Sequence, residues 1–162
     1  MEKGIMKDRK IEIHPSEKRL SIRFKIPGAT VCYQKKTWLF QKNSFDEEFC
    51  PLLDISRGGM KIASRKKLKP GNKVKLQLSI PGERAPLVLV GQVRWSSVYE
   101  NEVFKYQNGI QFNAYGDKKN QNYPGNLVKI ISLEQKFVDG EIDLSTPGED
   151  YEVEDSKTDQ QD

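Results

Sequence analysis

Alternation of apolar and polar residues over 74–80 constrains the fold of this chain more strongly than any other feature. The apolar set is Val74, Leu76, Leu78 and Ile80, and the polar set between them is Lys75, Gln77 and Ser79. A period of two places one set on a buried face and the other in solvent, which predicts a β-strand. Turn residues bound the segment at 67–72 and 81–84. This part of the chain therefore predicts short strands joined by tight connections.

Strand character continues along most of the chain. Apart from 74–80, the predicted strands are 30–33, 52–55, 60–63, 87–99 and 110–112. Gly91 lies in the middle of the longest of these and predicts a bulge or a bend, and Asn108-Gly109 precedes the last strand. Several short strands separated by turn signals predict an all-β barrel or sandwich.

One helix is predicted after the strands, over residues 126–137. Leu127, Ile130 and Ile131 share a face at helical spacing, and Asn126 is a residue type that caps helix starts. The fold class predicted from the residues is therefore all-β with one C-terminal helix.

Two short clusters carry the chemistry of the chain. The first contains Lys18, Arg19 and Arg23, and the second is Asp54-Ile55-Ser56-Arg57-Gly58-Gly59. Guanidinium groups bind phosphate or the O6/N7 edge of guanine, and they stack on bases. A carboxylate accepts from guanine N1–H and N2–H₂, a hydroxyl donates to phosphate, and glycine admits a ligand close to the backbone. Together the clusters predict a site for an anionic guanine nucleotide.

The two clusters, in this order, resemble the RxxxR and [D/N]xSxxG segments of the PilZ family of cyclic di-GMP receptors. The resemblance covers roughly residues 17–137, and Gly109-Ile110-Gln111-Phe112 is similar to the strand that precedes the family's final helix. It implies a small antiparallel β-barrel of about six strands. It also implies cyclic di-GMP as the ligand. The implied ligand-binding residues are Lys18, Arg19, Arg23, Asp54, Ser56, Gly58 and Gly59.

Two other functions fit parts of the sequence. The basic body, together with Tyr33, Trp38, Trp95 and Tyr106, suits a nucleic-acid-binding β-barrel with charge and stacking. A PilZ-like scaffold that acts only through protein partners is the third interpretation. Neither cluster is needed for polynucleotide binding, and both are intact, so cyclic di-GMP is favoured over nucleic acid as the partner.

Taken singly, each cluster also has a structural interpretation. The first cluster fits a solvated basic segment. The second fits an Asx or Ser turn with Gly58 or Gly59 at positive φ.

Catalysis and metal binding find little support. His14 is the only histidine, and Cys32 and Cys50 are far apart, so the usual nucleophilic triads and zinc sites cannot be assembled. The acidic residues at 46–48 are expected to be solvated on a charged loop. We therefore expect no enzymatic activity, no metal and no cofactor. The two cysteines are expected to be buried thiols in a reducing cytosol.

Charge divides the chain into unequal parts. Residues 139–162 contain ten acidic residues and one lysine, a net charge of −9, so residues 1–138 carry +13 within the overall +4. The expected organisation is a flexible leader over 1–16, a barrel domain with its helix over 17–137, and an acidic disordered tail over 138–162. No apolar run approaches the roughly eighteen residues of a membrane span, and no signal peptide is evident. A cytoplasmic location without membrane insertion is expected.

The clusters also suggest how ligand binding would be communicated to another protein. The basic segment 15–26 is expected to be mobile without ligand and to fold over the barrel when phosphates bind it. Because no output domain is evident, the new surface would be recognised by a separate output protein.

Overall fold

The computed structural model describes residues 22–37 and 44–145, the last seven as helix backbone only. They form six strands and one helix: β1 (Thr30–Lys35), β2 (Glu47–Ser56), β3 (Gly59–Ser64), β4 (Lys73–Ser79), β5 (Leu87–Val98), β6 (Tyr106–Phe112) and α2 (Pro124–Ser145). Each predicted strand corresponds to one observed strand.

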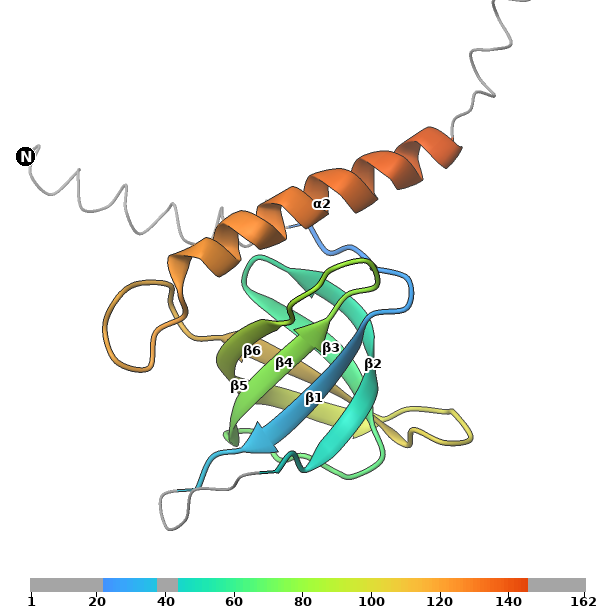
Figure 1. The fold of residues 1–162 in the computed structure, drawn as a ribbon. Helices are drawn as coiled ribbons and strands as arrows, with labels where there is room; N and C mark the ends of the chain where they lie inside the picture. Colours follow the sequence, from blue (N-terminus) through green and yellow to red (C-terminus); the bar gives the residue numbers. More distant parts are fainter. Residues whose placement is uncertain (1–21, 38–43, 146–162) are drawn as a thin grey trace, which may run out of the picture.

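The strands close into a single antiparallel barrel in the order β1-β2-β3-β6-β5-β4 (Figure 1). The predicted all-β class with a C-terminal helix is confirmed, and the barrel replaces the sandwich alternative. In β4 the predicted alternation is also observed. Val74, Leu76 and Leu78 are fully buried, whereas Lys73, Lys75 and Ser79 are exposed.

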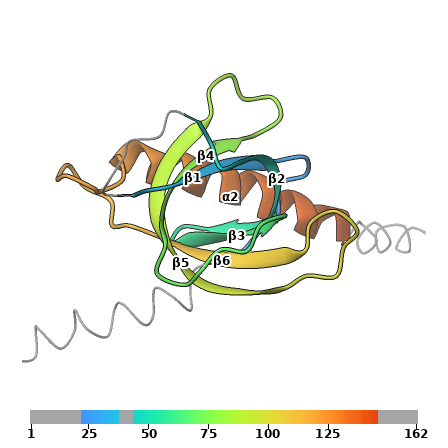
Figure 2. The ribbon, with the colours of Figure 1, turned by 90° about the horizontal axis from the view of Figure 1, so that it is seen from below.

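Helix α2 lies across one end of the barrel, and Figure 2 shows it behind the ring of strands. Ile130 and Leu133 are buried in the core, and Phe137 and Val138 pack against it. The helix begins two residues before the predicted start, because Pro124 suits a first helical position. Asn126 does not cap it: its side-chain amide donates to the carbonyl of Val88 at 2.9 Å.

Helix α2 also continues to Ser145, past the predicted end at Phe137. Phe137 and Val138 contact the core, so the helix is held to the barrel at the point where it was expected to stop. Gly140 lies inside the helix, where glycine is less favourable than alanine by only about 1 kcal/mol. Residues 138–145 are therefore helical rather than part of a disordered tail. The remainder of that tail, like residues 1–16, lies outside the described residues.

Glycine and asparagine in β5 and β6 have roles that the sequence analysis did not predict. Gly91 is not at the β5 bulge, which lies between Val93 and Trp95. Instead, a Cβ at Gly91 would overlap the carbonyl oxygen of Gln111, so close approach of β6 requires glycine. Asn108 and Gly109 lie inside β6 rather than before it. Asn108 is fully buried and donates to Ser64 Oγ at 2.9 Å, which satisfies its amide.

Glu47 is buried at the start of β2, contrary to the prediction of a solvated acidic loop. Its carboxylate accepts from Tyr33 Oη at 2.6 Å and from the backbone N–H groups of Arg65 and Lys66 at 2.9 Å each. Burial alone would raise the pKa of Glu47, but these hydrogen bonds outweigh burial and lower it below its usual value. The carboxylate therefore ties β1, β2 and the segment after β3 together.

The end of the segment 15–26 is part of the barrel core, which the sequence does not predict for this basic segment. Phe24 and Ile26 are buried, and Phe24 exchanges two backbone hydrogen bonds of 2.9 Å with Ile55. Their apolar side chains belong to the core, which the basic character of their neighbours concealed. Both cysteines, Cys32 and Cys50, are buried free thiols as predicted.

Within residues 22–37 and 44–145, no helix is both long enough and apolar enough to span a membrane.

Candidate functional site

A groove on the outer surface of the barrel lies where the β2–β3 turn meets β5 and β6. Its volume is about 550 Å³. The residues that line it are Arg23, Asp54, Ser56, Gly58, Gly59, Met60, Lys61, Arg94, Trp95, Gly109, Ile110 and Gln111. We refer to this set as the first groove.

Five residues predicted as ligand-binding meet in the first groove, although they come from two separate segments of the sequence. Arg23 precedes β1, Asp54 and Ser56 end β2, and Gly58 and Gly59 form the turn into β3. The remaining two predicted residues, Lys18 and Arg19, lie outside the described residues. The structure thus brings together all the predicted residues that it describes, and their ligand-binding role stays a prediction.

Asp54 is the electrostatic centre of the groove. Its Oδ1 lies 3.1 Å from Arg23 Nη1, and its Oδ2 lies 3.5 Å from Lys61 Nζ. The Asp54 side chain is only 13% exposed, whereas that of Arg23 is 65% exposed. The carboxylate is thus fixed, while the guanidinium is free to exchange partners at little energetic cost. Both oxygens can accept from another pair of donors that enters the groove.

Ser56 and the two glycines shape the turn beside Asp54. The backbone N–H of Gly58 donates to Ser56 Oγ at 3.3 Å, so the Ser-turn interpretation is correct for this hydroxyl. The predicted positive φ at Gly58 or Gly59 is wrong, because neither residue has one. A Cβ at Gly59 would overlap the carbonyl oxygen of Ile110 in β6, whereas a Cβ at Gly58 would meet open space. Gly59 is therefore required by strand packing, and Gly58 leaves the groove open.

Trp95 forms an aromatic wall of the groove. The β5 bulge precedes Trp95 and pairs it with Gly109, and a Cβ at Gly109 would overlap the indole. The indole therefore lies against the backbone of Gly109, and Trp95 remains 42% exposed. A half-exposed indole in a basic groove can stack on a base. The sequence predicts stacking by Trp95 only for the nucleic-acid alternative.

Two cations in the groove were not predicted: Lys61 from β3 and the exposed Arg94 from β5. Neither belongs to a recognisable motif. Strand register places them in the groove: Lys61 and Trp95 both pair with Gly109 on the strand between them, and Arg94 directly precedes Trp95. Barrel closure and the β5 bulge set this register, and neither follows from local sequence.

Arg57 connects the turn to helix α2. Its Nε and Nη2 donate to Glu134 Oε1 and Oε2 at 3.0 and 3.4 Å. Its carbonyl accepts from Tyr115 Oη at 2.7 Å. Burial raises the pKa of Tyr115 to about 12, so this hydroxyl remains a donor at neutral pH. The turn that carries Ser56 and Gly58 is thus anchored on both sides.

Comparison with known protein families identifies a match to the PilZ domain over residues 17–128. No curated protein matches the sequence. Among solved structures, the Bacillus subtilis inhibitor of motility (MotI/DgrA) is similar to this chain at 15% sequence identity and a TM-score of 0.49. That match covers 70% of this chain and 47% of the other, so this chain spans about half the length of that structure.

Proposed function

The chain belongs to the PilZ domain family, and from this premise we propose that it is a cyclic di-GMP receptor that binds the nucleotide in the first groove. PilZ domains are typically receptors without catalytic activity, and we extend that role to this protein. The proposal includes a cytoplasmic location, where the second messenger is produced and sensed.

One observation carries the proposal. Arg23 and Asp54 come from the two separate clusters, 31 positions apart, and their side chains meet at 3.1 Å in the same groove. Trp95 presents its exposed indole in that groove. A phosphate-binding cation, a guanine-binding carboxylate and a stacking ring are what a guanine nucleotide needs.

Each described residue has a specific role in this proposal. Asp54 accepts from guanine N1–H and N2–H₂, and in doing so releases Arg23 to a phosphate. Ser56 donates its hydroxyl hydrogen to a phosphate, since its oxygen already accepts from the turn. Trp95 stacks on the guanine ring. Gly58 keeps the groove open to the ligand.

Residues outside the described ranges complete the proposed site. Lys18 and Arg19 contribute further cations, and ligand phosphates draw the segment that precedes Arg23 over the groove. The ordering cost is offset by charge-assisted hydrogen bonds and stacking. An output protein then recognises the new surface. Because Phe24 and Ile26 belong to the barrel core, we expect the ordering to be confined to residues before Arg23.

Calorimetric titration with cyclic di-GMP tests the proposal, with GMP as the control nucleotide. We expect saturable binding of cyclic di-GMP at micromolar affinity or better and no comparable binding of GMP. At a ligand concentration of 100 times Kd, the free energy of unfolding should rise by about 2.7 kcal/mol, which a thermal shift detects. A folded protein that gives neither heat nor a thermal shift at about 100 μM ligand would instead fit the scaffold interpretation.

A further inference from the structure

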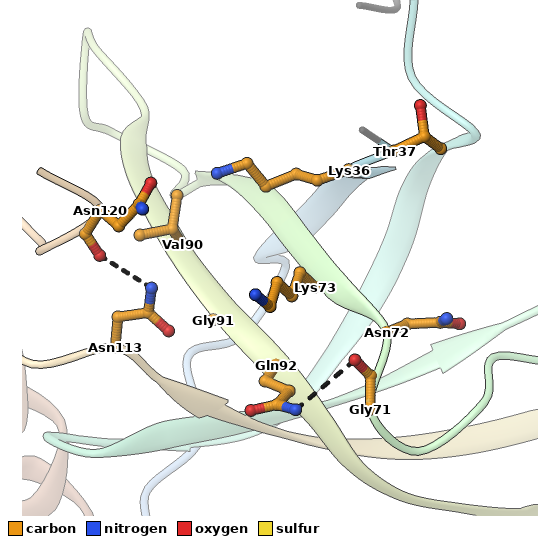
Figure 3. Close-up of a pocket in the computed structure, with 10 residues that line it drawn as sticks. All are labelled: Lys36, Thr37, Gly71, Asn72, Lys73, Val90, Gly91, Gln92, Asn113 and Asn120. Carbon is orange, nitrogen blue, oxygen red and sulfur yellow. Dashed lines mark hydrogen bonds between the residues drawn. The ribbon is translucent and has the colours of Figure 1, made fainter. Parts of the chain in front are cut away.

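A second groove lies on the outer surface of the barrel beside the first. Its volume is about 510 Å³. The residues used below are Lys36, Lys73, Gln92, Asn113 and Asn120, and we refer to this set as the second groove. In Figure 3, the amino ends of Lys36 and Lys73 reach over β5, and Asn113 and Asn120 lie across from them.

The second groove is suited to an anion. None of the described residues that line it is acidic. Lys36 and Lys73 are held together because the backbone N–H of Lys36 donates to the carbonyl of Lys73 at 2.8 Å. The carboxamide of Asn113 donates to the carbonyl of Asn120 at 2.8 Å, which fixes the opposite wall. Two ammonium groups facing carboxamides provide charge and hydrogen bonding without an aromatic ring, which suits phosphate and sugar rather than a base.

The two grooves are joined by one row of paired residues. Lys73 in β4 pairs with Gln92 in β5, Gln92 pairs with Gln111 in β6, and Gln111 pairs with Gly59 in β3. Gln92 lines the second groove, and Gln111 lines the first. Directly paired residues on adjacent strands lie on the same face of the sheet, so the grooves meet at this pair.

The row is longer than a single phosphate requires. Three steps between neighbouring strands, at about 4.8 Å each, give a path of roughly 14 Å around the curved barrel surface from Gly59 to Lys73. A ligand that uses both grooves must therefore be extended, with phosphates along its length. Lys73 lies at the β4 end of the row with Lys36 beside it, and Trp95 lies on β5 three positions along from Gln92. Charge and an aromatic ring therefore both border the row, and proteins combine these two features to bind single strands.

From this arrangement we propose that the two grooves together form a binding track for a short single-stranded nucleic acid. Trp95 stacks on a base in the first groove, Gln111 and Gln92 contact the strand between the grooves, and Lys36 and Lys73 neutralise phosphates in the second. The track shares the first groove with cyclic di-GMP, so the two ligands exclude each other. From the sequence, cyclic di-GMP is favoured over nucleic acid because both clusters are intact and neither is needed for polynucleotide binding. The second groove becomes recognisable only in the folded chain.

Binding of a fluorescein-labelled single-stranded RNA of eight nucleotides, measured by anisotropy against salt, tests this proposal. The variant Lys36→Gln/Lys73→Gln removes two charges from the second groove. A matched control, Lys105→Gln/Lys136→Gln, removes two exposed charges that line neither groove. For single strands, log K falls with log salt by about 0.7 per neutralised phosphate. The groove variant should therefore bind more weakly and lose about 1.4 from this slope. The control should keep the wild-type slope.

Other outcomes are equally informative. Equal loss in the two double variants would show a general charge effect and overturn the proposal, as would no binding at about 100 μM protein in low salt. Inorganic tripolyphosphate serves as a second probe. If it binds through Lys36 and Lys73 while the RNA does not bind, the groove accepts a small phosphate compound and the nucleic-acid assignment is wrong.

Cyclic di-GMP separates this proposal from the proposed receptor function. The groove variant should bind cyclic di-GMP as the wild type does, because neither lysine lines the first groove. Cyclic di-GMP should displace the RNA in proportion to its occupancy of the first groove. If cyclic di-GMP does not bind but the RNA behaves as expected, the receptor proposal fails and the track stands. Simultaneous binding of both ligands would overturn the shared track.

Discussion

Adjacent glycines in the β2–β3 turn serve different physical purposes. A Cβ at Gly59 would overlap the carbonyl oxygen of Ile110, so Gly59→Ala should push β3 from β6. Overpacking of this kind costs about 1 to 3 kcal/mol, and urea unfolding should show a loss of that size. At Gly58 a Cβ meets open space, so Gly58→Ala should stay within about 0.5 kcal/mol of the wild type.

The Gly58→Ala variant also distinguishes an effect on ligand binding from an effect on stability. Gly58→Ala narrows the first groove without disturbing the barrel, so it should weaken cyclic di-GMP binding in calorimetry while the unfolding midpoint is unchanged. Wild-type affinity in Gly58→Ala would show that the ligand does not approach the turn backbone.

Glu47 provides a pH-dependent test at one buried carboxylate. Glu47→Gln keeps the size of the side chain but removes the charge that accepts from Tyr33, Arg65 and Lys66. We expect the free energy of unfolding at pH 7 to fall by about 2 to 3 kcal/mol, because hydrogen bonds to a charged group are lost.

The pH dependence follows from the lowered pKa of Glu47 in the folded state. A carboxyl group with a lower pKa when folded than when unfolded stabilises the protein above its unfolded pKa of about 4.3. That contribution disappears as the pH falls through the folded value. The difference between wild type and Glu47→Gln should therefore shrink as the pH falls from about 5 into the acid range. A difference that is constant over this range would show that packing rather than charge is responsible.

Between elements, the Arg57–Glu134 pair is the polar link from the candidate site to helix α2. Glu134 is buried, so Arg57→Met should leave its carboxylate without its principal partner. We expect a loss of about 1 to 2 kcal/mol, less than for a fully buried pair because the Arg57 side chain is 46% exposed. Glu134→Gln and the double variant complete the cycle. A coupling energy near zero would mean that apolar contacts alone hold the helix.

The elements themselves were largely predictable because their signals are local. Period-two alternation located β4, and turn residues separated the other strands. The errors came from residues whose environment is set by distant partners. Glu47 is buried because donors from Arg65 and Lys66 reach it, and α2 extends past Phe137 because that side chain contacts the barrel. Neither partner is visible in the sequence around these residues.

The candidate site was predictable only in its motif residues. Asp54, Ser56, Gly58 and Gly59 are close in sequence, and resemblance to a family supplied Arg23. Lys61, Arg94 and the row from Gly59 to Lys73 depend on inter-strand register around a closed barrel. A shift of one residue would turn each of these side chains to the opposite face, so only the three-dimensional structure could identify them.

On the scale of the whole molecule, charge is distributed unevenly between the barrel and the end of the chain. The sequence places a net charge of −9 on residues 139–162 and +13 on the rest. Both grooves contain cations, so we expect the acidic residues to compete with ligand phosphates for them. Because α2 continues to Ser145, a shortened chain should end there rather than at residue 138.

The shortened chain therefore makes a directional prediction. Ending the chain at Ser145 should tighten cyclic di-GMP binding in low salt, because it removes seven acidic residues and only one lysine. The gain should diminish as salt approaches about 0.5 M, where the Debye length falls well below 10 Å. Calorimetric titration of both chains at two salt concentrations measures the effect, and the unfolding midpoint serves as a control for α2. Equal affinities of the two chains at low salt would show that the acidic residues do not reach the groove.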